Sequence, residues 1–114
     1  MQFRTLFRSI RPSFLILSPV CVFLGTSTAI NAGDSVDAFV LTLIVIGAVC
    51  AHISVNTLNE YSDFKSGLDL ITIKTPFSGG SGALPGNPAM ANMVLAAGLV
   101  TFSLTLAIGI YFIS

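Results

Sequence analysis

Four polar side chains recur at helical spacing near the middle of the chain. They are His52, Asn56, Asn59 and Asp63. Intervals of four, three and four residues place them on one face of an α-helix. The first of them lies within an apolar stretch, where polar groups are costly unless they face a bundle interior or a wet cavity. We therefore expect this face, here called the polar stripe, to line a site.

Acidic side chains next to the polar stripe would add oxygen ligands to it. Glu60 lies at the edge of the stripe, four residues after Asn56. Gly67 suits the left-handed residue that ends many helices, so the helix should end near it. A chain reversal at that point would let Asp69 fold back toward the same cavity. The sequence thus groups three carboxylates and two amides.

Such a set of oxygen ligands favours binding of magnesium and a diphosphate. Mg²⁺ takes one or two carboxylates together with phosphate oxygens. Carboxylates alone would repel a diphosphate, so metal ions would have to bridge them. Lys65 and Lys74 are then candidates to neutralise phosphate charge directly. The simpler alternative is that Asp63 and Lys65 are solvated at a helix end and that His52 is a buried, hydrogen-bonded histidine.

Three long apolar runs must position these residues. Hydrophobic residues make up 54% of the 114 residues and charged residues only 9%, against about 25% charged in ordinary globular domains. The runs at about 12–30, 38–59 and 88–112 contain no Asp, Glu, Lys or Arg. A helix crosses a bilayer core with about 20 apolar residues. We predict an all-α transmembrane helical bundle of three spans, with residues 1–114 forming one membrane domain.

The placement of charge predicts how the spans are oriented. All basic residues precede the first span or lie in the connection 60–87: Arg4, Arg8, Arg11, Lys65 and Lys74. The connection 31–37 carries Asp34 and Asp37 and no basic residue. The positive-inside rule then places the N-terminus and the connection 60–87 in the cytoplasm. We expect a multi-pass protein of a cell membrane, with a bacterial inner membrane as the expected location.

The charge pattern also bears on nucleic-acid binding and on secretion. The net charge is zero, so no basic excess exists to bind nucleic acid. A cleaved signal peptide is an alternative for the N-terminus, because three arginines precede an apolar run that contains the small residues Ser27 and Ala29. The run 12–30 is, however, longer than the usual apolar region of a signal peptide.

Prolines and glycines predict local features of the spans. Pro12 and Pro88 suit the first turn of a helix, where the missing N–H costs nothing. Pro19 lies inside the first span and should kink it. Gly98 and Gly109 in the third span should allow close helix packing.

The segment 56–69 resembles the first Asp-rich motif of the UbiA superfamily of membrane prenyltransferases. It reads N-T-L-N-E-Y-S-D-F-K-S-G-L-D, and the family pattern is N-x-x-N-D-x-x-D followed by a further Asp. The Tyr after the acid and the closing G-x-D are similar to the dihydroxynaphthoate prenyltransferases of menaquinone synthesis. Segments 75–82 and 11–14 also resemble bacterial members of that branch. Glu60 stands where the family usually has Asp.

The resemblance implies an all-helical enzyme that binds a polyprenyl diphosphate on Mg²⁺ and alkylates an aromatic acceptor such as dihydroxynaphthoate. By match, Asn59 and Asp63 would be catalytic, as ligands of the metal and the diphosphate. The candidate metal ligands are Asn59, Glu60, Asp63 and Asp69. The candidate substrate-binding residues are Asn56, Lys65, Asp69 and Lys74.

The family's second Asp-rich motif has no counterpart, because no Asp or Glu follows Asp69. We therefore expect the chain to be the N-terminal part of such an enzyme, with prenyl transfer incomplete in this chain alone. A partner chain supplying the second motif is one way to complete the site. The alternatives are a small non-catalytic three-helix membrane subunit or scaffold, whose polar stripe serves helix association, and a nonfunctional remnant of a truncated gene.

Overall fold

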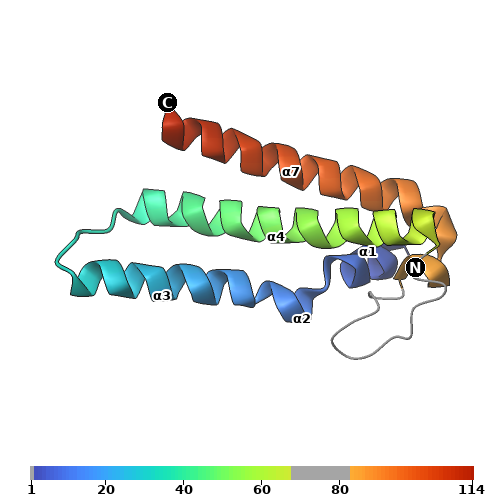
Figure 1. Cartoon of the computed structure of the whole chain (residues 1–114), viewed down its shortest axis with the longest axis horizontal. Helices are drawn as coiled ribbons and strands as arrows, with labels where there is room; N and C mark the ends of the chain where they lie inside the picture. The colour runs from blue at the N-terminus through green and yellow to red at the C-terminus, as the bar shows by residue number, and fades with distance from the viewer. Residues whose placement is uncertain (1, 68–82) are drawn as a thin grey trace.

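The computed structural model describes residues 2–67 and 83–114, and its regular elements there are all helices (Figure 1). In chain order they are α1 (Gln2–Ile10), α2 (Pro12–Leu15), α3 (Leu17–Asn31), α4 (Ala38–Ser66), α6 (Ala83–Gly86), the 3₁₀ helix η1 (Pro88–Met90) and α7 (Ala91–Ile113). The predicted all-α fold is therefore confirmed for the described part of the chain. Asp69 and Lys74 lie outside the described residues.

The first three helices follow one another with two interruptions. Arg11 separates α1 from α2 with φ 57° and ψ 63°, and Pro12 is the first residue of α2. Ile16 separates α2 from α3. Pro19 has no N–H to donate to the carbonyl of Leu15, so the helical hydrogen bond that would span this second interruption cannot form. Pro12 is confirmed as a helix start, and the helix is interrupted just before Pro19, where a kink is expected.

The helix α4 is longer than a membrane core requires. It begins after Asp37, whose Oδ1 accepts a hydrogen bond from the backbone N of Val40 at 3.0 Å, as an N-cap does. It ends at Gly67, which has φ 79° and donates its N–H to the carbonyl of Phe64 at 3.2 Å. Its 29 residues rise about 43 Å, whereas the hydrocarbon core is about 30 Å thick. It is therefore longer than the core by about nine residues, and the predicted end near Gly67 is confirmed.

Replacement of Gly67 by Ala should lower the thermal unfolding midpoint of the protein in detergent. Nothing lies within 4 Å of a Cβ built on Gly67, but a left-handed backbone costs about 1 kcal/mol or more in a residue that has a Cβ. Gly25→Ala in α3 is the matched control, because its Cβ also meets nothing within 4 Å and its φ is not positive. A midpoint that falls as far in Gly25→Ala as in Gly67→Ala would contradict this explanation.

Three helical stretches are long and apolar enough to cross a membrane. They are Gln2–Asn31, Ala38–Ser66 and Pro88–Ile113. The third begins with Pro88 as the first residue of η1, as expected from the sequence, and continues directly into α7. α4 lies between α3 and α7 (Figure 1). The N-terminus and α6 lie at one end of the bundle, and the C-terminus and the α3–α4 connection lie at the other (Figure 1).

The described part of the chain buries few apolar side chains. A small buried cluster lies around α6, η1 and the start of α7, and consists of Leu84, Met90, Ala91 and Val94, with Leu6, Tyr61 and Phe64 packed against it. Along the spans, large apolar side chains such as Phe23, Ile44 and Phe102 are exposed. Lipid chains can cover such surfaces, which water would not favour. This distribution supports a bilayer environment.

Candidate functional site

The first half of the polar stripe faces the first span. Nδ1 of His52 lies 2.8 Å from Oγ of Ser18 on α3. Nδ2 of Asn56 donates a hydrogen bond to the carbonyl of Ile10 on α1 at 2.8 Å. Ser18 and Ile10 both belong to the N-terminal helices, and the sequence pattern did not indicate that these residues contact the polar stripe. His52 and Asn56 therefore join α4 to α3 and α1, and His52 is hydrogen-bonded as the simpler alternative expects.

The Asn56 contact fixes the end of α1. Ile10 is the last residue of that helix and is followed by the left-handed Arg11. Carbonyl groups in the last turn of a helix have no partner within the helix. The side-chain amide of Asn56 supplies a donor to one of them. The position of α1 is therefore coupled directly to the polar stripe.

The second half of the polar stripe is open. Nδ2 of Asn59 donates a hydrogen bond to Oδ2 of Asp63 at 3.1 Å. Asn59 is exposed and Asp63 is half-buried. These residues, here called the Asn59–Asp63 pair, lie in the last turns of α4, more than 20 residues after its start. The pair presents amide and carboxylate oxygens at an accessible part of the surface.

Glu60 points into the packing between α4 and α6. Neighbouring helix residues differ in direction by about 100°, so Glu60 leaves the helix on a different side from Asn59. Its side chain is 2% exposed, and Oε1 accepts a hydrogen bond from the backbone N of Leu84 at 3.3 Å. A buried carboxylate needs such donors. Glu60 thus anchors α6 to α4, and its oxygens are withdrawn from the surface that carries the Asn59–Asp63 pair.

Glu60→Ala should reduce the thermal stability of the protein more than Glu60→Gln does. Gln retains an oxygen that can accept the hydrogen bond from Leu84, whereas Ala leaves a buried N–H without this acceptor, at a cost of about 1–3 kcal/mol. Unfolding midpoints in detergent measure both effects. A Gln variant that is as unstable as the Ala variant would show that the negative charge itself, and not the acceptor, holds α6 in place.

The remaining candidates are not brought to the Asn59–Asp63 pair in the described part of the chain. Lys65 is exposed, and its Nζ lies 5.7 Å from the centre of the Tyr61 ring. Two helix positions separate Lys65 from Asp63, which directs their side chains about 200° apart. Asp69 and Lys74 lie outside the described residues, so their predicted positions near the pair stay predictions.

The donor set of the Asn59–Asp63 pair suits Mg²⁺ when other ligands complete the shell. Within residues 2–67 and 83–114, no group of three His, Cys, Asp or Glu side chains could hold a metal ion. The pair brings one carboxylate and one amide oxygen. Mg²⁺ is commonly held by one or two carboxylates, with water and substrate phosphates as its other ligands. Asn59 and Asp63 fit such a partial site.

Polar contacts of α1 form a part of this region that the sequence pattern did not indicate. Thr5 and Ser9 are buried, and Nδ2 of Asn87 donates a hydrogen bond to Oγ1 of Thr5 at 3.2 Å. The contact between Asn87 and Thr5 holds α1 beside the turn that leads into the third span. The signal for the helix itself is present in the sequence, as apolar residues at helical spacing: Phe3, Leu6, Phe7 and Ile10.

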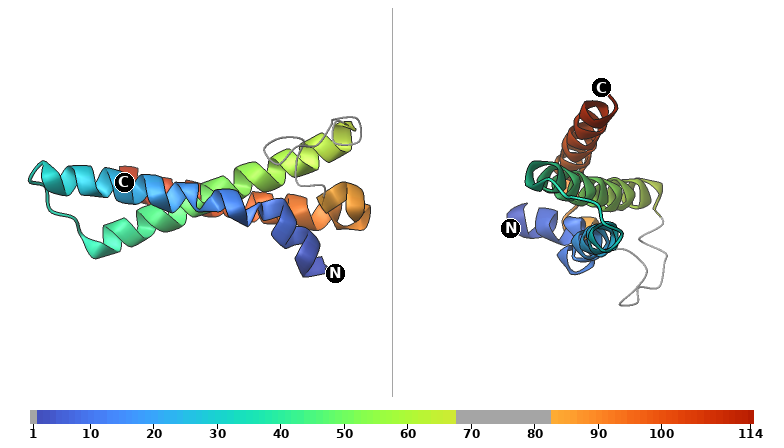
Figure 2. Two further views of the ribbon diagram at one scale, coloured as in Figure 1. Left: turned by 90° about the horizontal axis from the view of Figure 1, so that it is seen from below. Right: turned by 90° about the vertical axis from the view of Figure 1, so that its left-hand side faces the viewer.

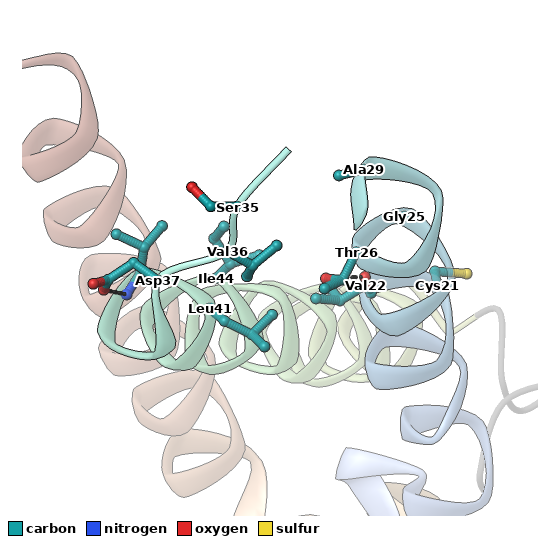
Figure 3. A pocket seen from close by; sticks show the side chains of 11 residues that line it. Cys21, Val22, Gly25, Thr26, Ala29, Ser35, Val36, Asp37, Leu41 and Ile44 are labelled. Atoms are coloured by element: carbon teal, nitrogen blue, oxygen red, sulfur yellow. Dashed lines mark hydrogen bonds between the residues drawn. The ribbon is translucent and has the colours of Figure 1, made fainter. Parts of the chain in front are cut away.

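An apolar groove of about 540 Å³ lies between α3 and α4 near their connection (Figure 3). Val22 and Thr26 of α3 lie across from Leu41 and Ile44 of α4 (Figure 3). Among the described residues that line it, only Asp37 is charged, and this residue caps α4. Ile44 precedes His52 by about two helical turns. The groove therefore lies away from the Asn59–Asp63 pair and supplies no cluster of oxygen ligands from the described part of the chain.

The polar stripe is thus divided into a hydrogen-bonded half against α1 and α3 and an open half that carries the Asn59–Asp63 pair. Comparisons of the chain with protein-family models, curated proteins and solved structures found no match. The link to prenyltransferases therefore rests on the motif in residues 56–69.

Proposed function

We propose that the chain takes part in Mg²⁺-dependent transfer of an isoprenyl group from a polyprenyl diphosphate to an aromatic quinone precursor. The observation that carries this proposal is the open Asn59–Asp63 pair, 3.1 Å apart, at the end of a helix that can span a membrane. The pair falls within the segment that resembles the prenyltransferase motif. A catalytic role for Asn59 and Asp63 follows from that match.

The dimensions of α4 suit a substrate with an apolar tail and a charged head. The tail of a polyprenyl diphosphate is soluble in lipid, whereas its diphosphate needs charged or polar partners. The first part of α4 is apolar, and the Asn59–Asp63 pair lies in its last turns. One helix therefore offers both environments, at the distance that separates a membrane core from its surface.

In the proposed reaction, the allylic C–O bond of the substrate breaks and the diphosphate leaves with the bonding electron pair. The isoprenyl carbon then bonds to the aromatic ring, which loses a proton. Mg²⁺, when bound, would stabilise the charge that develops on the leaving diphosphate. Asn59 and Asp63 would hold the diphosphate end through that ion, and Asn56 would keep the neighbouring helix α1 in place. Apolar side chains of the spans would exclude water.

Asp69, Lys65 and Lys74 have proposed roles that depend on the connection after α4. Asp69 would add a supporting acid, and Lys65 and Lys74 would contact phosphate oxygens. A second acidic motif would have to come from elsewhere, because no acid follows Asp69. A partner chain that carries such a motif, in the same membrane, is one proposed way to complete the site.

Binding of farnesyl diphosphate tests the proposal directly. The purified protein in mild detergent is titrated with this ligand in the presence of Mg²⁺ and again in the presence of EDTA. Saturable binding is expected only with Mg²⁺. Inorganic diphosphate with Mg²⁺ serves as a control for the contribution of the tail and should bind more weakly. Absence of saturable binding under every condition would overturn the assignment of this site.

A non-catalytic scaffold is a second candidate, favoured by the first half of the polar stripe. His52 and Asn56 are hydrogen-bonded to Ser18 and Ile10 of the first span, which is how polar side chains hold helices together in membranes. A scaffold needs no ligand at the Asn59–Asp63 pair. It predicts a stable, helical protein that binds no farnesyl diphosphate with or without Mg²⁺, which is the opposite of the enzymatic prediction.

A further inference from the structure

The helix α1 turns its apolar face outward. Phe3 is 88% exposed and Phe7 is 61% exposed. Positions three, six, seven and ten share one side of a helix, and Phe3, Leu6, Phe7 and Ile10, together with Arg4, line one shallow hollow. A helix in water would normally bury this face. Something apolar is therefore needed to cover Phe3 and Phe7.

The inward face of α1 is polar, and its contacts fix the orientation of the helix. Thr5 and Ser9 are buried against the rest of the protein. Oγ1 of Thr5 accepts a hydrogen bond from Asn87 at 3.2 Å, and Ile10 accepts one from Asn56 at 2.8 Å. Rotation of α1 to hide its two phenylalanines would break both contacts. Their exposure thus follows from the packing of the helix.

The length of the first span places α1 outside the hydrocarbon core. Residues 12–30 already rise about 28 Å, which is close to the core thickness of about 30 Å. The left-handed Arg11 interrupts the helix immediately before this span. α1 also turns away from the direction of α3 (Figure 2). It therefore leaves the bundle at the level where lipid headgroups begin.

Among the described residues, this end of the bundle carries four basic and two acidic side chains, an excess that suits an anionic membrane surface: Arg4, Arg8, Arg11 and Lys65 against Glu60 and Asp63. Arg4 flanks the exposed face of α1, about 100° from Phe3, and Arg11 follows the helix. The connection at the opposite end of the bundle carries Asp34 and Asp37 instead. Basic residues next to an apolar helix face are typical of helices that lie on anionic lipid.

We propose that α1 lies in the interface of an anionic phospholipid leaflet. Phe3 and Phe7 enter the boundary between headgroups and acyl chains, and Arg4 lies near lipid phosphates. The covering surface is therefore the same bilayer that the three spans cross. This assignment does not depend on the proposed enzymatic activity, because it concerns a different helix and a different ligand.

Tryptophan fluorescence tests this location, because the natural chain contains no Trp. Phe3→Trp and Phe7→Trp are made separately and reconstituted in vesicles of phosphatidylcholine and phosphatidylglycerol. Lipids carry bromine either near the headgroup or deep in the acyl chain. Shallow bromine should quench both variants more strongly than deep bromine, by about twofold or more. Phe102→Trp, at an exposed position in the middle of α7, is the control and should be quenched more by deep bromine.

Two outcomes would overturn the assignment. Quenching of both variants by aqueous iodide, without quenching by brominated lipid, would place α1 in water. Protection from both quenchers that increases with the protein-to-lipid ratio would show that a second copy covers the face. The headgroup contact has its own test. In the Phe7→Trp background, quenching by brominated lipid is compared between vesicles with and without phosphatidylglycerol, and Arg4→Gln should reduce this difference. An unchanged difference would contradict the role of Arg4.

Discussion

Asp63→Asn should weaken Mg²⁺-dependent binding of farnesyl diphosphate by about 100-fold, the upper end of what loss of a metal site's partners costs. Asn has nearly the same size and can still hydrogen-bond to Asn59, but it lacks the negative charge with which Asp63, the one carboxylate of the pair, would attract Mg²⁺. Asp63 is half-buried at the end of α4, so helix content should not change. Titration calorimetry in one detergent measures the affinity, and circular dichroism measures the helix content.

Ser62→Ala provides the matched control for this experiment. Ser62 is the exposed neighbour of Asp63 and leaves α4 about 100° away from it. Its replacement should leave the affinity unchanged. Equal losses in the two variants would indicate that the helix end was disturbed as a whole. An Asp63→Asn protein that binds as tightly as the natural chain would remove Asp63 from the site.

Gly98→Ala should lower the thermal unfolding midpoint more than the alanine replacements of Gly25, Gly67 or Gly109. An added Cβ would lie 2.6 Å from Cδ2 of Leu58, 2.8 Å from its Cγ and 2.9 Å from Oγ1 of Thr57. Thr57 is fully buried, and its Oγ1 donates a hydrogen bond to the carbonyl of Ile53 at 2.7 Å. Leu58 and the buried Thr57 would have to shift, or α4 and α7 to separate locally, and overpacking of this kind costs about 1–3 kcal/mol.

Two further variants separate this contact from a general effect of alanine in α7. Gly109→Ala lies in the same helix, where an added Cβ meets nothing within 4 Å, and should not lower the midpoint. Leu58→Ala should restore part of the stability lost in Gly98→Ala, because it removes two of the three close atoms. A midpoint for Gly98→Ala equal to that of the natural protein would show that α4 and α7 do not approach this closely.

The spans and their ends are predictable because they depend on local properties. Apolar length alone indicates three membrane helices, and the structure contains three helices that meet this requirement in its described part. Pro12, Pro88 and Gly67 mark helix starts and an end because their backbones restrict or permit particular torsion angles. The orientation of the spans, with the N-terminus in the cytoplasm, stays a prediction.

The close contact between α4 and α7 is a feature that the local sequence predicts only in part. The sequence predicts close helix packing at both Gly98 and Gly109, but only Gly98 of these two lies against a neighbouring helix at a distance that a Cβ would violate. A small residue permits close approach but does not cause it. Which glycine is used depends on where α4 and α7 meet along their length.

Part of the candidate site is predictable from the sequence, because helical spacing is a local property. Helical spacing aligns Asn56, Asn59 and Asp63, and the structure places the last two within hydrogen-bond distance. Spacing also places Glu60 near this face, but its burial against α6 depends on how the chain returns after α4. The catalytic and metal-binding roles of these residues stay predictions.

The sequence alone determined the helical fold, the three apolar spans, the ends of α4 and the alignment of the polar stripe, because each depends on residues a few positions apart. Only the tertiary structure decided that His52 meets Ser18, that Glu60 meets Leu84 and that Asn87 meets Thr5. These residues are far apart in the chain, and their contacts arise from the packing of whole helices. The packing therefore divides one continuous stripe into a structural half and an open half, and it turns the phenylalanines of α1 outward.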